Sequence, residues 1–225
     1  MENVIRDIAR QYLPQRTHYY YARIKLATDP LYAGAGAALA GTREPLLDLG
    51  CGIGLLAHAL RAQGFHADYR GVDIDEAKIA SANAACARAK LVGVHFESRD
   101  LATGFPDHRG SVALLDIVQF LPPEAQEALL ERSIASLTPD GVLVMRTGLQ
   151  REGWRLRFTR AVDRLARLSR WMNVGPQRYP SRADLEQRFD RHGLRATYRR
   201  LHGRLPFENW LICASRPRGG GTASR

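Results

Sequence analysis

Residues 46–54 constrain the fold more than any other segment, because they join an apolar strand directly to a glycine-rich turn. They read Leu-Leu-Asp-Leu-Gly-Cys-Gly-Ile-Gly and precede a helical pattern. Glycine allows positive φ angles and lets a ligand approach the backbone, and the start of a helix offers unpaired N–H groups. The segment predicts a strand–turn–helix unit that binds a polar or anionic group. A tight turn without a ligand is the alternative at this point.

Short apolar runs and helical patterns alternate from this segment onward, which predicts a parallel, doubly wound α/β sheet. We expect parallel strands at residues 45–49, 69–73, 94–97, 112–116 and 142–147. We expect helices at residues 4–12, 18–27, 31–40, 55–63, 76–89, 124–137 and 182–192. Two further strand-like runs, close enough to pair antiparallel, lie at residues 195–201 and 208–214.

The composition fits one soluble domain, with 225 residues, 45% of them hydrophobic and 25% charged. Cys51, Cys86 and Cys213 lie far apart, so neither a disulfide framework nor a metal site is expected. The N-terminus lacks the basic and apolar regions of a signal peptide. The longest apolar stretch, residues 112–121, is half the length that a bilayer requires. We therefore expect a cytoplasmic protein without a transmembrane helix.

The net charge of +10 is distributed unevenly along the chain. Residues 1–140 contain 14 basic and 17 acidic residues, whereas residues 141–225 contain 19 basic and 6 acidic residues. A basic protein often binds nucleic acid or an anionic surface. Here only the C-terminal part has the excess charge that such a partner would recognise.

Two acidic residues follow the second and third expected strands. Asp73 ends the second strand, where a carboxylate can accept both hydroxyls of a ribose. Asp100 follows the third strand and can accept a hydrogen bond from an exocyclic amine. The carboxyl ends of parallel strands meet at one edge of a sheet, so these acids and the glycine turn are expected to line one nucleoside-binding crevice.

The glycine spacing distinguishes between nucleoside cofactors. A dinucleotide fingerprint needs glycine at the sixth position of G-x-G-x-x-G, where this chain has Leu55, with Gly54 one residue early. The actual spacing, with Asp48 ahead of it, resembles the D-x-G-x-G-x-G motif of class I S-adenosylmethionine-dependent methyltransferases. The resemblance extends over residues 45–214 and includes the segments GVDIDEAKIASANA, HFESRDL, LLDIVQFLPPEAQEALL and LTPDGVLVMRTG.

This resemblance implies a Rossmann-like sheet of seven strands, mostly parallel with an antiparallel last strand, together with N-terminal helices and a helical cap insertion. It implies a single methyltransferase domain at residues 1–214, made of an N-terminal helical lid (1–41), a cofactor-binding core (42–147), a basic helical insertion (148–180) and the last helix and strand pair (181–214). A disordered tail is expected at residues 215–225.

The resemblance also implies S-adenosylmethionine as the only cofactor. In the family, the glycine turn lies beneath the methionine part, the second-strand acid binds the ribose, and the residues after the third strand surround the adenine. Carried over to this chain, the cofactor-binding residues are Asp48, Gly50, Cys51, Gly52, Asp73, Ile74, Asp100, Leu101 and Asp116. Asp48 is expected to order the turn through its backbone donors, and Asp116 is expected to border the methyl-donating end.

No catalytic residue is assigned. Family members often place a histidine near the end of the fourth strand, where this chain has Gln119 and Phe120. Cys51 is expected to fill space in the turn rather than to act as a nucleophile.

Residues 18–32 read HYYYARIKLATDPLY. They form either a lid, in which Tyr20, Arg23 or Lys25 meets the carboxylate of the cofactor, or a helix that packs its tyrosines on the sheet. The segment resembles methyltransferases of bacterial aryl-polyene pigment pathways. That resemblance implies secondary metabolism and a phenolic, polyene or fatty acid-like acceptor.

Residues 151–172 have apolar positions at helical spacing and a net charge of +5. This basic helix fits an acidic acyl carrier protein that delivers the acceptor, or an anionic membrane surface, which would make the protein peripheral to the inner membrane. An RNA methyltransferase is an alternative function, although the fourth strand lacks the Asn/Asp-Pro-Pro-aromatic element of base-amino methyltransferases. A non-catalytic cofactor-binding regulator is another alternative.

Overall fold

The strands expected from the short apolar runs join in one sheet. The computed structural model describes residues 2–150, 178–201 and 209–217, and in this part of the chain the sheet has seven strands in the order β3-β2-β1-β4-β5-β7-β6. The strands are β1 Leu46–Leu49, β2 Tyr69–Asp73, β3 Val94–Ser98, β4 Ser111–Leu115, β5 Val142–Gly148, β6 Arg195–Leu201 and β7 Asn209–Ser215. Neighbours from β3 to β5 are parallel, and β7 is antiparallel to β5 and β6.

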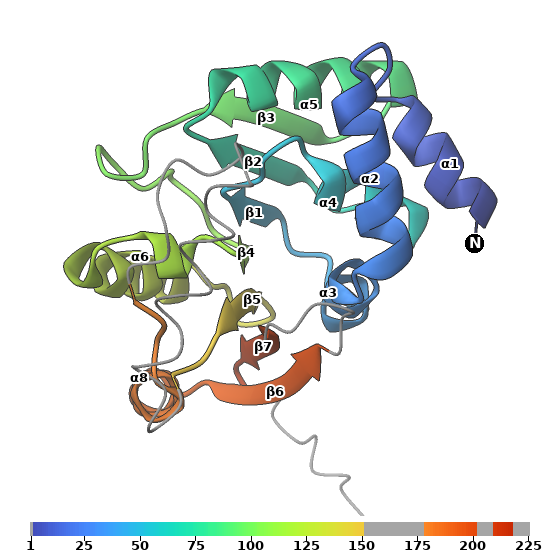
Figure 1. Cartoon of the computed structure of the whole chain (residues 1–225). Coiled ribbons are helices and arrows are strands. Elements are labelled where there is room, and N and C mark those ends of the chain that lie inside the picture. The colour runs from blue at the N-terminus through green and yellow to red at the C-terminus, as the bar shows by residue number, and fades with distance from the viewer. Residues whose placement is uncertain (1, 151–177, 202–208, 218–225) are drawn as a thin grey trace, which may run out of the picture.

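Helices cover both faces of this sheet (Figure 1). Helices α3 Leu31–Leu39, α4 Leu55–Ala62 and α5 Glu76–Ala89 pack on one face, and α6 Pro123–Ala135 and α8 Arg182–Arg191 pack on the other. Because both faces are buried, β1 consists of four buried residues, Leu-Leu-Asp-Leu, instead of alternating with polar positions. The two apolar layers fix the strand ends that form the site.

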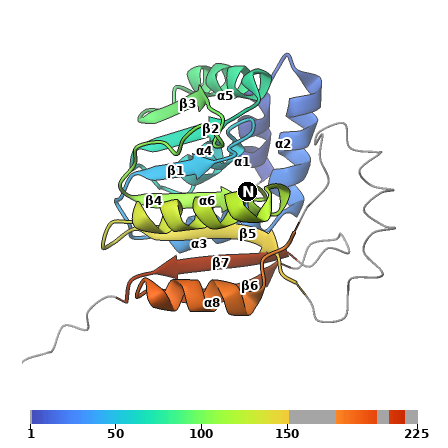
Figure 2. The same ribbon diagram turned by 90° about the vertical axis from the view of Figure 1, so that its left-hand side faces the viewer.

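The N-terminal helices form an outer pair. Helix α1 Glu2–Arg10 packs on α2 Arg16–Thr28. Ala9 of α1, Ala22 of α2 and Tyr12 between the two helices form one buried apolar cluster with Leu55 at the start of α4. In Figure 2, α2 stands beside the end of the sheet toward which the parallel strands point. The N-terminal segment therefore borders the edge where a doubly wound sheet binds its ligand.

The fold class predicted from the sequence is confirmed, and most element ends lie within two residues of the expected ones. Strand β4 ends at Leu115 because Asp116 adopts a positive φ of 61°. At the C-terminus, β7 extends to Ser215, and Arg216 donates to the carbonyl of Thr138 at 3.1 Å. The expected tail thus begins later than residue 215.

The expected basic helix at 151–172 lies outside the described residues, as do residues 218–225 of the expected tail. Among the helices that the structure describes, none combines the length and the apolar character needed to cross a bilayer.

Candidate functional site

The glycine turn after β1 presents an open backbone surface. Gly50, Gly52 and Gly54 have positive φ angles of 77°, 56° and 74°. The N–H groups of Gly50 and Cys51 both donate to the carbonyl of Val72, at 2.8 and 3.0 Å. None of the residues that the structure describes would lie within 4 Å of a Cβ atom at Gly52. A ligand can therefore approach the backbone at Gly52, which fits the cradle expected for a cofactor.

Asp73 joins the end of β2 to this turn. Its Oδ2 accepts the N–H of Gly52 at 2.8 Å, and its Oδ1 accepts the N–H of Asp75 at 3.0 Å. The next residue, Ile74, is 67% exposed, which leaves an apolar surface beside the carboxylate. An acidic acceptor next to an exposed apolar side chain is a suitable arrangement for a ribose and a base.

Asp100 lies beside the same edge. The N–H of Arg99 donates to the carbonyl of Asp73 at 3.0 Å, so the loop after β3 runs next to the end of β2. The Oδ1 of Asp100 accepts the N–H of Ala102 at 2.8 Å, and Leu101 packs on the apolar layer below α6. The structure therefore brings together Gly52, Asp73 and the Asp100 loop, as the sequence predicts.

Asp48 differs from its expected role. It is 1% exposed and accepts a hydrogen bond from the Tyr69 hydroxyl through Oδ2, while Oδ1 has no hydrogen-bond partner among the described residues. The turn N–H at Gly52 is held by Asp73 instead. Burial raises the pKa of Asp48 to about 7, although the Tyr69 hydrogen bond opposes the shift. The side chain of Asp48 is therefore directed to Tyr69, which belongs to the apolar layer below α4 and α5, and not to the N–H groups of the turn.

Asp116 follows β4 and is paired with a buried arginine. Arg146 on β5 donates through Nε to Asp116 Oδ1 at 2.7 Å and through Nη2 to Asp116 Oδ2. A Cβ atom at Gly50 would lie 3.0 Å from Ile117, so the end of β4 lies beside the glycine turn. This places the end of β4, which carries Asp116, close to the turn.

The end of β4 carries no histidine. Gln119 is buried, and its Oε1 accepts the Thr147 hydroxyl at 3.2 Å. Burial and the Asp116 charge raise the pKa of Tyr21 to about 12 and also raise that of Tyr179. These phenols therefore remain protonated at neutral pH. The Cys51 thiol also stays protonated because burial raises its pKa, which agrees with a space-filling role.

Two of the residues expected in the lid, Tyr20 and Arg23, face away from the glycine turn. Tyr20 and Arg23 line a hollow of about 510 Å³ between α1 and α2, together with Glu2, Ile5 and Ile24. Lys25 pairs with Asp29 at 3.0 Å. The described residues thus give Tyr20 and Arg23 an outward position, whereas Tyr21 of the same helix is directed toward the sheet edge near Asp116.

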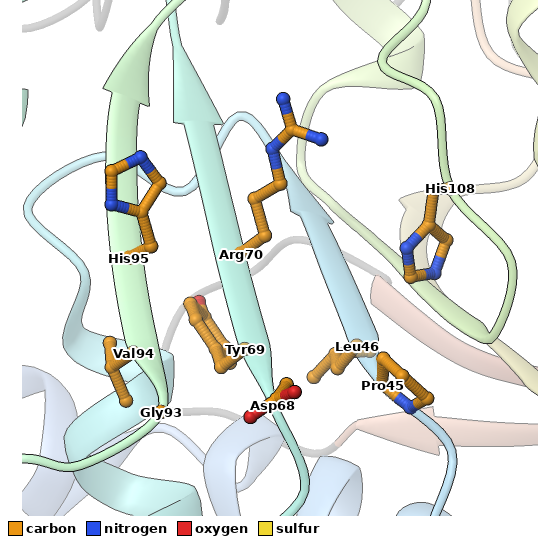
Figure 3. A pocket seen from close by; sticks show the side chains of 9 residues that line it. All are labelled: Pro45, Leu46, Asp68, Tyr69, Arg70, Gly93, Val94, His95 and His108. Carbon is orange, nitrogen blue, oxygen red and sulfur yellow. The ribbon is translucent and has the colours of Figure 1, made fainter.

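A second hollow, of about 430 Å³, lies at the amino ends of β1, β2 and β3 (Figure 3). Pro45, Asp68 and Gly93 line it at the strand starts, and Arg70, His95 and His108 line it from the strands and the loop before β4. It lies at the edge opposite the glycine turn, where doubly wound sheets do not bind their ligand. We therefore place the candidate site at the carboxyl edge.

Comparison with known protein families shows which enzyme class this sheet edge belongs to. Residues 18–198 match a family described as a methyltransferase domain. The chain belongs to this methyltransferase family. No curated protein sequence matches the chain significantly. The membership confirms the enzyme class that the glycine motif predicts, whereas nothing in it tests the aryl-polyene subtype.

Solved methyltransferases share the fold at low identity. Magnesium protoporphyrin IX methyltransferase from Synechocystis PCC 6803, solved with bound S-adenosylhomocysteine, is 19% identical with a TM-score of 0.62, covering 83% of this methyltransferase and 82% of that chain. An O-methyltransferase family protein from Burkholderia thailandensis is 17% identical with a TM-score of 0.65, covering 96% and 64%. An O-methyltransferase from neocarzinostatin biosynthesis, solved with S-adenosylhomocysteine and 1,4-dihydroxy-2-naphthoic acid, is 17% identical with a TM-score of 0.59, covering 87% of this methyltransferase and 55% of that chain.

These neighbours agree with S-adenosylmethionine as the cofactor, because two of them hold its demethylated product. This methyltransferase spans less than two thirds of the Burkholderia and neocarzinostatin chains. Each of those chains is therefore substantially longer than the part that it shares with this methyltransferase.

Sequence reasoning missed three residues at this edge. Arg146 donates hydrogen bonds to Asp116 and also to Asp29, which follows helix α2. The Tyr12 hydroxyl donates to the carbonyl of Ile53 in the glycine turn at 3.1 Å. A charged residue within the apolar run of β5 was the available signal for Arg146. Nothing local marks Asp29 or Tyr12, because their partners lie far away in the sequence.

Proposed function

We propose that this methyltransferase transfers the methyl group of S-adenosylmethionine to a small or carrier-bound organic acceptor of phenolic, polyene or fatty acid-like chemistry. The observation that carries donor binding is the Asp73 carboxylate, which holds the Gly52 N–H at 2.8 Å and faces the glycine turn next to the exposed Ile74. Membership of a methyltransferase family supports the reaction class.

The donor supplies a methyl group on a positively charged sulfur, which is already electrophilic. The protein then has to align the donor with the acceptor and exclude water. Gly50 and Gly52 would lie beneath the methionine part, Asp73 would accept the ribose hydroxyls, and Ile74 would cover one face of the adenine. The Asp100 loop would lie beside the adenine amine.

The side chains near the end of β4 favour an acceptor that is already ionised when it binds. Among the described residues there, Asp116 is bound to Arg146, Gln119 has no basic group, and Tyr21 and Tyr179 keep their protons. General-base catalysis needs a group that accepts a proton near the operating pH. A carboxylate acceptor needs no such group, which supports an organic acid within the proposed acceptor classes.

Calorimetry with S-adenosylmethionine tests donor binding. We expect micromolar affinity for the wild type and a loss of roughly 1–3 kcal/mol for Asp73→Ala, because charge-assisted hydrogen bonds to the ribose disappear. Asp75→Asn is the matched control, since it removes a nearby charge while an asparagine still caps α5. Unchanged binding by Asp73→Ala, or stronger binding of NAD than of S-adenosylmethionine, would sink the proposal.

Methyl transfer from labelled donor tests the acceptor. We expect label on a fatty acid or an aryl-polyene carboxylic acid, free or bound to an acyl carrier protein, in preference to the corresponding methyl ester. Label on RNA instead would favour the alternative of an RNA methyltransferase. Donor binding without label on any species of a cell extract would favour a non-catalytic cofactor-binding regulator.

A further inference from the structure

Arg146 connects three elements at the sheet edge. Its side chain is 7% exposed and bonds through Nε and Nη2 to both carboxylate oxygens of Asp116, while Nη1 donates to Asp29 Oδ2 at 2.5 Å. Burial opposes the charge of Arg146, but Asp116 and Asp29 outweigh it and raise its pKa. The rigid fork of a guanidinium can satisfy two carboxylates at once, which a lysine ammonium cannot match in geometry.

Asp29 anchors the other side of this guanidinium. It lies between α2 and α3, where its Oδ1 accepts the N–H of Leu31 at 3.0 Å and its Oδ2 also accepts from Lys25 at 3.0 Å. Burial alone would raise the pKa of Asp29, but the Arg146 charge and hydrogen bond lower it. Arg146 is therefore bound on one side by Asp29 and on the other by Asp116.

Asp116 is the exposed member of the group. Its side chain is 34% exposed and its φ is 61°, a conformation that residues other than glycine adopt rarely. Its N–H donates to the carbonyl of Arg146 at 3.0 Å, so backbone and side chain are both tied to β5. The adjacent Ile117 packs on Gly50, which places the oriented carboxylate beside the turn that would hold the methionine part.

We propose that Arg146 is a positioning residue that orients the Asp116 carboxylate so that the site binds the sulfonium donor more tightly than the neutral product. This rests on the proposed function. S-adenosylmethionine carries a positive sulfonium that S-adenosylhomocysteine lacks. The Arg146 charge opposes attraction of that sulfonium, but Arg146 is also paired with Asp29, so it does not cancel the charge of Asp116. A fixed carboxylate in a partly buried site attracts a positive charge more strongly than in water. Preference for the donor would also help product leave after methyl transfer.

The affinities of the full chain for both ligands, measured by calorimetry, test the proposal. For Asp116→Asn we expect S-adenosylmethionine to bind about tenfold more weakly and S-adenosylhomocysteine to change less than about twofold, as expected for loss of one charge–charge contact. Arg146→Lys keeps the positive charge but not the fork. We expect Arg146→Lys, like Asp116→Asn, to reduce the preference for S-adenosylmethionine over S-adenosylhomocysteine.

Arg188→Lys is the matched control. Arg188 on α8 is 13% exposed on its side chain and pairs with Glu131 on α6, on the face of the sheet opposite α3. We expect this variant to keep the wild-type affinity ratio. Thermal unfolding of each variant separates loss of folding from loss of preference, and Asp116→Asn decides the question if Arg146→Lys does not fold.

Two results would overturn the inference. A purely structural role for Arg146 predicts a lower melting temperature with both ligands weakened equally, so an unchanged ratio in Asp116→Asn and Arg146→Lys excludes positioning. A wild-type chain that binds neither ligand would overturn the proposed function and this inference together. Binding of both ligands with an unchanged ratio in the variants overturns only the inference.

Discussion

At the scale of single residues, Asp48 makes stability depend on pH. Its folded-state pKa of about 7 lies above the ordinary value, so between about pH 4 and about pH 7 the folded chain holds a proton that the unfolded chain has released. The free energy of unfolding therefore falls as the pH rises through this window. Asp48→Asn removes the titration, and we expect it to stabilise the cofactor-free protein by on the order of 1–2 kcal/mol at about pH 8.

Urea unfolding at about pH 4 and about pH 8 measures this effect. The two proteins should differ little at about pH 4, where Asp48 is protonated in the folded chain and only about half ionised in the unfolded chain. Asp140→Asn, at an exposed loop position, is the control that removes a carboxylate without removing a buried one. Equal stabilisation by Asp48→Asn at both pH values would contradict the assignment.

At the scale of elements, Gly54 lets helix α4 begin close against β3 and α5. Its φ is 74°, and a Cβ atom there would lie 2.5 Å from the ring of Phe96 and 3.1 Å from Ala82. We expect Gly54→Ala to lower the free energy of unfolding by about 2–5 kcal/mol, because backbone strain adds to overpacking. Chemical denaturation measures the loss.

Gly64→Ala separates the two causes. Gly64 also has a positive φ, of 85°, but in the described part of the chain no atom would lie within 4 Å of a Cβ atom there. We expect a loss of only about 1–2 kcal/mol from this variant, the cost of the left-handed conformation alone. If both alanine variants lose the same stability, the contact with Phe96 does not set the start of α4.

At the scale of the whole molecule, the charge is divided between a nearly neutral core and a basic C-terminal part. In the described part, Arg182 pairs with Glu186 and Arg188 with Glu131, so some of the basic residues serve the fold. The cluster at 151–172 has only two acidic residues for seven arginines. We propose that this cluster recruits an acidic carrier protein or an anionic membrane surface that delivers the acceptor.

Charge removal at Arg160, Arg164 and Arg167 tests this proposal. We expect glutamine at all three positions to leave the affinity for S-adenosylmethionine unchanged and to weaken capture of an acyl carrier protein or of vesicles with anionic lipids. The interaction should also weaken with rising salt. If both interactions remain intact in the triple variant, the cluster is only solvated surface.

Much of the fold and part of the site follow from local sequence patterns. The apolar run before Gly50 and the acid at Asp73 are each read within a few residues, and the rule that parallel strands end at one edge brings them together. The prediction that Asp48 binds the backbone N–H groups of the glycine turn was wrong. A strand pattern does not reveal toward which layer a buried carboxylate points. Its partner Tyr69 lies 21 residues away on the neighbouring strand.

The sequence by itself determined the sheet and the glycine turn, because these depend on short-range periodicity and on glycine conformations. The enzyme class came from the resemblance of the glycine motif to that of class I methyltransferases. Only the tertiary structure decided how Asp116 is held. Arg146 is 30 residues from Asp116 and 117 residues from Asp29, and the three meet because β4 pairs with β5 while α2 ends beside the same sheet edge. Contacts of this kind depend on strand order and helix placement, which no local pattern encodes.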